Sequence, residues 1–269
     1  MQVPHFLTVA YVGTSFSGWQ VQSVLPSVQG TLWDALRRFH PEAPLPQGTG
    51  RTDAGVHARA QGVLVLCPRI WEGYRLLAAF NAFLPPEIRV MSAQQAPEGF
   101  HPRHHAVAKR YTYRLMEGPA QDPFERGRRW HHFGAEPLDR AAMAEAAAHL
   151  VGTHDFSSFR NPECVAKSPV RSIYAVTLRE DGPRMDLEFE GNRFLMHQVR
   201  IMAGTVVEAG RRRLAPAAMP EVLAARSRAA AGPTAPPEGL WLEKVWYQAR
   251  WGIGEPCPWG ESEALGSGL

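Results

Sequence analysis

The clearest strand pattern of the sequence is Val107-Ala-Lys-Arg-Tyr-Thr-Tyr-Arg-Leu115. Successive side chains of a β-strand point to opposite faces, so Tyr111, Tyr113 and Leu115 share one face. Arg110, Thr112 and Arg114 share the other face. This alternation predicts a strand with one face in a core and one polar face.

The residues that follow this strand alternate between strand and helix patterns. An alanine-rich helix, two strands, a helix with regularly spaced apolar residues and a final strand come in that order. The order β-α-β-β-α-β is the signature of a ferredoxin-like fold. The five predicted elements are Asp139 to Leu150, Ser172 to Leu178, Arg184 to Glu190, Phe194 to Glu208 and Leu240 to Tyr247.

The first half of the chain also alternates, in the order β, α, β, α. Its first helix begins at Thr31, which with Asp34 has the spacing of a capping box, and its second is stopped by Pro85 and Pro86. The predicted fold class is α+β, with two ferredoxin-like (RRM-like) subdomains sharing a mainly antiparallel sheet that has helices on one side. The four elements are Phe6 to Tyr11, a helix from Thr31, Gly62 to Cys67 and Leu76 to Leu84.

Composition and patterning predict three segments. Residues 1–103 form an N-terminal α/β subdomain, residues 104–248 form the C-terminal ferredoxin-like subdomain, and residues 249–269 form a flexible tail rich in Gly, Pro and Ser. The Pro- and Ala-rich stretch from Pro216 to Glu238 is predicted to contain a connector. Neither it nor the tail has the features of a catalytic segment.

Charge and cysteine usage narrow the class of protein. The net charge is only +3, but 26 of the 29 basic residues are arginines, whose planar guanidinium suits phosphate and base recognition. Three scattered cysteines indicate neither a disulfide framework nor a zinc site. No apolar run approaches the ~20 residues that span a bilayer, and we expect a cytoplasmic protein.

One loop has the composition of a catalytic loop. Gly50-Arg-Thr-Asp-Ala-Gly-Val-His57 lies between the first helix and the next strand, and its glycines permit close approach of a ligand or another backbone. The residues beside Asp53 are small and shield its side chain little. The alternative is an ordinary turn in which Asp53 bonds its own backbone.

A second group of polar residues falls on the predicted helix after the acidic strand. Arg193, His197 and Arg200 are spaced at i, i+4 and i+7, with Gly204 next on that face. Arg200 would then reach a carboxylate and keep it ionised, because an opposite charge lowers the pKa of an acid. An ordinary solvated helix face is the alternative.

A third segment, Phe100 to Arg114, interleaves aromatic and cationic residues, which suits stacked bases and phosphates. A strand with core tyrosines explains the same pattern. The histidines at 101, 104 and 105 raise the possibility of a metal, but no acidic or cysteine partner motif accompanies them. We therefore expect no metal site.

Together these segments resemble the tRNA pseudouridine synthase A (TruA) family over nearly the whole chain, to about Tyr247. The resemblance favours the functional interpretation of all three segments. The stretches that carry it are Tyr11 to Gln20, Ser27 to Thr31, Gly50 to Ala58, Asn81 to Arg89, Phe100 to Tyr113, Asp155 to Phe159, Phe194 to Gly204 and Ala235 to Gly239.

The resemblance implies a role for four residues. Asp53 matches the essential aspartate, Tyr111 the base-contacting tyrosine, and Arg200 the arginine that pairs with the aspartate. Arg51 matches the position that helps to hold the flipped nucleotide. Two departures concern RNA contacts rather than catalysis, because Val12 replaces the usual Asp and Ile201 the common Asn.

The implied activity is isomerisation of uridine to pseudouridine at positions 38, 39 and 40 of the tRNA anticodon arm, by a homodimer without a cofactor. Asp53 would attack ribose C1′, add to uracil C6 or remove the 2′ proton to give a glycal. Two other classes of protein fit parts of the pattern. One is a non-catalytic RNA-binding protein, and the other is a metal-dependent hydrolase that uses the histidines.

Overall fold

The structure is a computed structural model that describes residues 2–134 and 136–260. These residues form two compact units. The first unit contains residues 2–107 together with Leu242–Pro258, and the second contains Ala108–Trp241 together with residues 259–260. The predicted tail falls partly outside the description, since residues 261–269 are not among the described residues.

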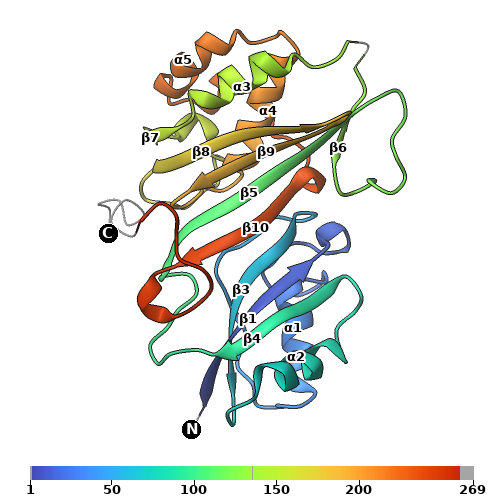
Figure 1. Cartoon of the computed structure of the whole chain (residues 1–269), viewed down its shortest axis with the longest axis vertical. Coiled ribbons are helices and arrows are strands. Elements are labelled where there is room, and N and C mark those ends of the chain that lie inside the picture. Colours follow the sequence, from blue (N-terminus) through green and yellow to red (C-terminus); the bar gives the residue numbers. More distant parts are fainter. Residues whose placement is uncertain (1, 135, 261–269) are drawn as a thin grey trace. The chain divides into compact units, whose positions relative to one another are not determined.

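The first unit is a sheet in the order β4-β1-β3-β10, with β2 paired to β3. Strand β1 runs antiparallel to both of its neighbours. Helices α1 and α2 lie on one side of these strands (Figure 1). The elements are β1 (Val3–Tyr11), α1 (Val28–Arg37), β2 (Gln47–Gly48), β3 (His57–Cys67), α2 (Gly73–Asn81), β4 (Ile88–Gln95) and β10 (Leu240–Tyr247).

Helix α1 begins earlier than its sequence spacing predicts. Ser27 is the N-cap, and its Oγ accepts the backbone N–H of Gly30 at 3.2 Å. Thr31 lies inside the helix, where its hydroxyl donates to the carbonyl of Ser27 at 2.9 Å. The capping box at Thr31 and Asp34 is thus wrong, because Ser27 satisfies the orphan N–H one turn earlier.

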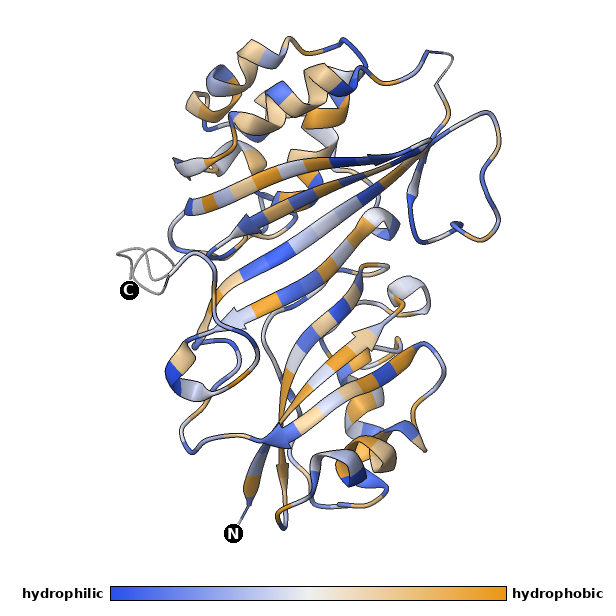
Figure 2. Cartoon of the chain, in the orientation of Figure 1, coloured by the Kyte–Doolittle hydropathy of each residue, from blue (hydrophilic) through white to orange (hydrophobic). Residues whose placement is uncertain are grey.

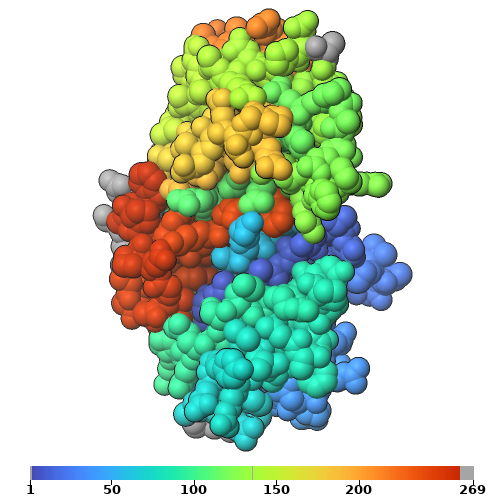
Figure 3. Space-filling model, turned by 45° about the vertical axis from the view of Figure 1, so that its right-hand side comes forward, coloured from blue at the N-terminus to red at the C-terminus, as the bar shows by residue number. Residues whose placement is uncertain are grey.

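Strand β4 is an element that the sequence pattern did not reveal. It pairs with β1, and the Asn81 side chain at the end of α2 fixes its start. The Asn81 amide donates to the carbonyl of Val90 and accepts the N–H of Val90, both at 2.9 Å. Figure 3 shows α2 and β4, in turquoise, at the surface of this unit.

The second unit has its sheet in the order β5-β9-β8-β7, with the short β6 parallel to β5. Its helices α3, α4 and α5 lie on one side of these strands (Figure 1). The elements are β5 (Ala106–Glu117), β6 (Trp130–His132), α3 (Arg140–Ala148), β7 (Gly152–Asp155), β8 (Val170–Asp181), β9 (Arg184–Gly191), α4 (Gln198–Gly210) and α5 (Met219–Ala224).

Alternation in β5 and β9 builds the core of the second unit. Tyr111 stands opposite Phe189, and Tyr113 stands opposite Leu187. The side chains of Tyr113, Leu187 and Phe189 are all fully buried. The two predicted strands and their apolar faces are therefore confirmed, and Figure 2 shows apolar and polar residues alternating along these strands.

Segments predicted as irregular carry structure of their own. The connector from Pro216 to Glu238 contains α5 and three short 3₁₀ turns. In the C-terminal segment, Ile253 is buried and the ring of Trp251 stacks on His105 at a centroid distance of 4.3 Å.

The fold is mixed α/β with mostly antiparallel strands. No helix of the described residues is long and apolar enough to cross a membrane.

Candidate active site

The loop that carries Asp53 joins β2 to β3 in the first unit, and Thr52 anchors it. The Thr52 side chain shares a 2.8 Å hydrogen bond with the hydroxyl of Tyr11. The Thr52 carbonyl accepts the N–H of Trp19 at 3.0 Å. Burial raises the pKa of Tyr11, which keeps its phenol neutral. Asp53 therefore follows a backbone position that is fixed on two sides.

After Asp53 the chain makes a tight turn. The N–H of Val56 donates to the carbonyl of Asp53 at 3.2 Å, and Gly55 has φ of +79°. A positive φ at this third position is what a type II turn requires. A backbone turn is present here, formed with the carbonyl of Asp53, and the Asp53 side chain is partly exposed.

Two glycines let the segment after β1 run directly against this loop. A Cβ at Gly18 would come within 2.5 Å of the carbonyl oxygen of Thr52, and φ of Gly18 is +97°. A Cβ at Gly13 would come within 1.9 Å of the carbonyl oxygen of Val56. The glycines of the Tyr11 to Gln20 motif thus shape the Asp53 loop rather than a separate feature.

Arg51 lies two residues before Asp53 on the same loop, and its side chain is exposed. The loop therefore brings together the two predicted site residues of the first unit. Next to them, the carbonyl of Gly50 accepts the amide of Gln61 at 2.7 Å. The backbone next to Arg51 is therefore held in place, while the Arg51 side chain is exposed at the surface.

Tyr111 and Tyr113 lie on the same face of β5 in the second unit, yet their surroundings differ. Tyr113 has no exposed surface, and its hydroxyl donates to the carbonyl of Pro236 at 2.7 Å. Burial raises its pKa. Tyr111 retains 8% exposure and meets the ring of Phe194 edge-on at 5.1 Å. The core-tyrosine interpretation thus fits Tyr113 more closely than Tyr111.

Arg200 lies in the first turn of α4 and is held by the segment before β10. Its Nε donates to the carbonyl of Ala235 at 2.8 Å, while its own carbonyl accepts the N–H of Ala235 at 3.1 Å. A Cβ at Gly204 would come within 1.9 Å of the carbonyl oxygen of Pro233, so this close approach depends on glycine. The Ala235 to Gly239 motif is therefore the support of Arg200.

The helix that carries Arg200 starts later than predicted. Helix α4 begins at Gln198, and His197 is its N-cap with φ of +61°. The Gln198 side chain accepts the N–H of Leu195 at 2.8 Å, which stabilises a non-helical entry. Arg193 consequently lies in a loop, and the predicted helical face of Arg193, His197 and Arg200 is wrong.

The two departures from the family pattern lie in ordinary structural positions. Ile201 is fully buried, so the residue that replaces the common Asn contributes to the core. The N–H of Val12 donates to the carbonyl of Glu87 at 2.9 Å, which fixes the end of β1. Neither substitution disturbs the hydrogen bonds that hold Thr52 or Arg200.

The ring nitrogens of the histidine cluster stabilise a turn. Nδ1 of His101 accepts the N–H of Arg103 at 3.1 Å, and Nδ1 of His105 accepts the N–H of His101 at 3.0 Å. Within residues 2–134 and 136–260, no group of three or more His, Cys, Asp or Glu residues has an arrangement that could hold a metal ion.

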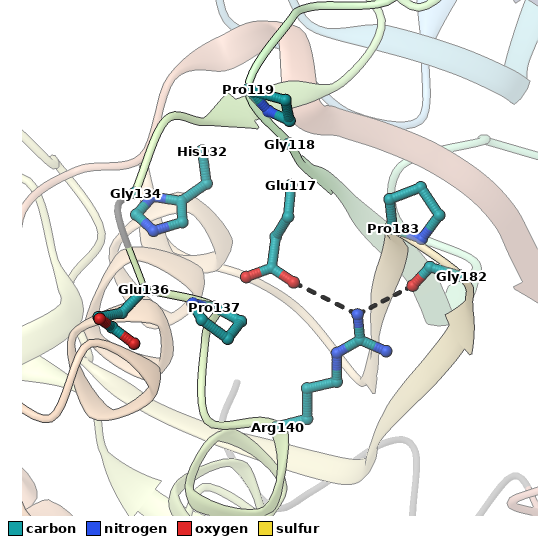
Figure 4. Close-up of a pocket in the computed structure, with 10 residues that line it drawn as sticks. All are labelled: Glu117, Gly118, Pro119, His132, Gly134, Glu136, Pro137, Arg140, Gly182 and Pro183. Carbon is teal, nitrogen blue, oxygen red and sulfur yellow. Dashed lines mark hydrogen bonds and ion pairs between the residues drawn. The ribbon is translucent and has the colours of Figure 1, made fainter.

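A surface pocket of the second unit contains none of the predicted site residues. Figure 4 shows that it is lined by the ends of β5 and of the β8–β9 hairpin and by the chain leading to α3. Arg140 donates to the carbonyl of Gly182 at 2.8 Å and pairs with Glu117 at 3.3 Å. These contacts join β5, the β8–β9 hairpin and α3 at the pocket.

Comparison with known proteins adds a further finding. Residues 146–248 match a family model described as tRNA pseudouridine synthase. Proteins named "tRNA pseudouridine synthase A" are similar over 90% of this chain, at 42% identity in Myxococcus xanthus and 44% in Moorella thermoacetica. The matches cover 91% and 98% of those two proteins, respectively. The chain therefore belongs to the tRNA pseudouridine synthase A family.

Proposed function

We propose that this chain isomerises uridine to pseudouridine at positions 38, 39 and 40 in the anticodon arm of tRNA. The observation that carries the proposal is the Gly50 to His57 loop, in which Asp53 is partly exposed on a turn anchored by Thr52. The similarity to relatives over 90% of the chain supports the same reaction class. The enzyme is then an isomerase that acts on RNA.

The reaction needs a carboxylate beside the ribose of the target uridine. The bond between ribose C1′ and uracil N1 breaks, the base turns, and C1′ joins C5. The C5 proton goes to solvent and N1 takes up a proton, so the atoms balance. Asp53 acts as nucleophile at C1′ or C6, or as the base that removes the 2′ proton. The product contains the same atoms as the substrate, so the reaction needs no redox or group-carrying cofactor.

The remaining site residues bind and orient the nucleotide in this proposal. The target base must leave the helical stack, and Tyr111 then stacks on the extruded uracil. Arg51 holds the displaced backbone, since guanidinium groups match phosphate geometry. The guanidinium of Arg200 keeps the Asp53 carboxylate ionised, because an opposite charge stabilises the ionised form. The hydrogen bond from Arg200 Nε to Ala235 supports this role, as it restricts the direction of the side chain.

We also propose the architecture and setting that accompany this activity. The order β5, α3, β8, β9, α4, β10 supports a ferredoxin-like C-terminal subdomain over residues 104–248, after an N-terminal subdomain over residues 1–103. The proposal includes two such subdomains sharing one sheet, a homodimer and a cytoplasmic location. Size-exclusion chromatography with light scattering tests the dimer directly.

Mapping of pseudouridine in tRNA tests the function. Unmodified tRNA is incubated with the wild-type chain, with Asp53→Asn or with Asp34→Asn, which replaces an exposed aspartate of α1 as a control. We expect pseudouridine at positions 38 to 40 with the wild type and the control, and none with Asp53→Asn. Pseudouridine only at other positions would refute the assigned substrate. Unmodified tRNA that remains bound by the wild type would favour the non-catalytic RNA-binding alternative.

A further inference from the structure

Two loops and the start of β8 in the second unit carry three neighbouring arginines that have no part in the catalytic proposal. The loop before β8 contacts the loop before α4 through the N–H of Asn161, which donates to the carbonyl of Met196 at 3.1 Å. The N–H of Asn192 also donates to the carbonyl of Ser172 at 3.0 Å. Arg160 lies in the loop before β8, Arg171 at the start of β8 and Arg193 in the loop before α4, and we call them the Arg171 cluster.

Backbone carbonyls orient the cluster without neutralising it. Nη1 of Arg171 donates to the carbonyls of Ser168 at 3.0 Å and Val170 at 2.5 Å. Nη2 of Arg160 donates to the carbonyl of Cys164 at 2.7 Å. Nε of Arg171 is buried without a hydrogen-bond partner. A buried N–H donor that makes no hydrogen bond is costly, so this atom marks an incomplete site.

The cluster makes no ion pair with a carboxylate of the described residues, although Asp155 attracts Arg160 at longer range. In the described part of the chain, no carboxylate lies within ion-pair distance of Arg160, Arg171 or Arg193. Burial, followed by the charge of Arg193, lowers the pKa of Arg171. Asp155 is the acid that interacts electrostatically with Arg160. Its direct partners are Arg226, at 3.4 Å, and Ser157, from which it accepts two hydrogen bonds.

Like charges in a partly buried position are unfavourable unless an anion joins them. Guanidinium groups present paired N–H donors that fit the oxygens of a phosphate, and Arg193 is exposed at the rim of the cluster. We propose that the Arg171 cluster binds phosphodiester groups of the tRNA backbone. This assignment rests on the proposed function for the identity of the RNA.

Such a site holds the substrate equally well before and during the reaction. Removing it therefore raises KM and leaves kcat near the wild-type value. It also reduces the salt dependence of binding, because each phosphate contact releases counterions from the nucleic acid. These two signatures separate a phosphate contact from a residue that takes part in chemistry.

The experiment compares two double variants in the full chain. Arg160→Gln with Arg193→Gln removes two charges of the cluster, and Arg75→Gln with Arg179→Gln removes two exposed, ion-paired arginines as the matched control. We expect the cluster variant to raise KM for tRNA roughly tenfold with kcat within about twofold. The slope of log K against log salt becomes shallower by about one per arginine. The control changes neither quantity comparably.

Binding measured in the Asp53→Asn background separates this proposal from the proposed function. A weakened, less salt-dependent binding supports the phosphate site even if the wild-type chain forms no pseudouridine. Equal KM, affinity and salt slope for the cluster variant and the control would overturn it. The single exposed change Arg193→Gln keeps the test valid if the double variant misfolds, with a slope change of about one as the expected result. An unchanged slope for that variant contradicts the proposal.

Discussion

Nε of Arg200 donates a 2.8 Å hydrogen bond to the backbone carbonyl of Ala235, so the guanidinium of α4 is aimed by the segment that leads into β10. The reverse hydrogen bond, from the N–H of Ala235 to the carbonyl of Arg200, closes a two-point attachment. The direction of this side chain is therefore set by backbone groups. Conservative changes that keep the charge still alter its geometry.

Arg200→Lys tests this geometry. Lysine keeps the charge but has no Nε–H branch, so it cannot both donate to Ala235 and present a planar fork. We expect kcat to fall by roughly tenfold or more, because misplacement of a catalytic group by 1 Å can cost ~10²-fold. The melting temperature should change by only a few degrees. Arg179→Lys, an exposed arginine of β8, is the control, and equal kcat for both variants would contradict the account.

Gly18→Ala tests the contact between the segment after β1 and the Asp53 loop. The new Cβ would lie 2.5 Å from the carbonyl oxygen of Thr52 at a residue with φ of +97°. We expect a loss of about 1–3 kcal/mol in the free energy of unfolding, together with a clear fall in kcat. The measurements are urea denaturation and steady-state kinetics.

Gly182→Ala provides the matched control for that substitution. Its φ is +55°, but a Cβ there would meet nothing within 4 Å. Gly182→Ala should therefore lower the free energy of unfolding by only about 1 kcal/mol, through the unfavourable positive φ, and leave kcat unchanged. If Gly18→Ala behaved in the same way as this control, the close packing of the loop would have no role in activity.

The two tyrosines of β5 should respond differently to substitution. Tyr111→Leu removes the proposed stacking ring, and we expect activity to fall tenfold or more, since base stacking is worth about 1–3 kcal/mol. Tyr113→Phe removes only the hydroxyl that donates to Pro236, and it should cost about 1 kcal/mol of stability with kcat within twofold. Parallel kinetics and denaturation give both numbers. A larger loss of kcat in Tyr113→Phe would reverse the assignment.

We expect the buried His5 to make the free energy of unfolding fall at acid pH. Its ring is fully buried, with one nitrogen 3.1 Å from the carbonyl of Val3 and the other accepting the N–H of Trp71 at 3.1 Å. Burial lowers its pKa below the usual 6.5. The folded state therefore binds its proton less readily than the unfolded state does, so this stability is present above pH 6.5 and is lost as the pH falls below it.

The measurement for His5 is the free energy of unfolding from pH 7.5 to 5. His5→Gln should be less stable at pH 7.5 and should show a flatter profile below pH 6.5. His154→Gln, which replaces a more exposed histidine of β7, is the control and should retain the slope of the wild type. An identical slope in His5→Gln and the wild type would remove the assigned role.

The sequence predicts those elements whose burial pattern is local. Alternation in β9 placed Met185, Leu187 and Phe189 on one face, and all three are fully buried. Strand β10 has the predicted bounds, Leu240–Tyr247. In these strands the alternation of apolar and polar residues is enough to predict the buried face, and the identity of the neighbouring strand is not needed.

Elements fixed by distant partners were missed or misplaced. Strand β4 depends on pairing with β1 and on the two hydrogen bonds between Asn81 and Val90. The start of α4 depends on His197 in the left-handed conformation, which helical spacing cannot reveal. The support of Arg200 by Ala235 joins residues 35 positions apart. The Ala235 to Gly239 stretch could be recognised as a motif, but its role required the structure.

The most direct test of the central claim is tritium release from tRNA labelled at C5 of uridine. Joining C1′ to C5 expels that atom, whereas binding or cleavage of the base alone does not. We expect release by the wild-type chain that continues in excess chelator, and no release by Asp53→Asn, which still binds tRNA. Release by Asp53→Asn at the wild-type rate would contradict the account.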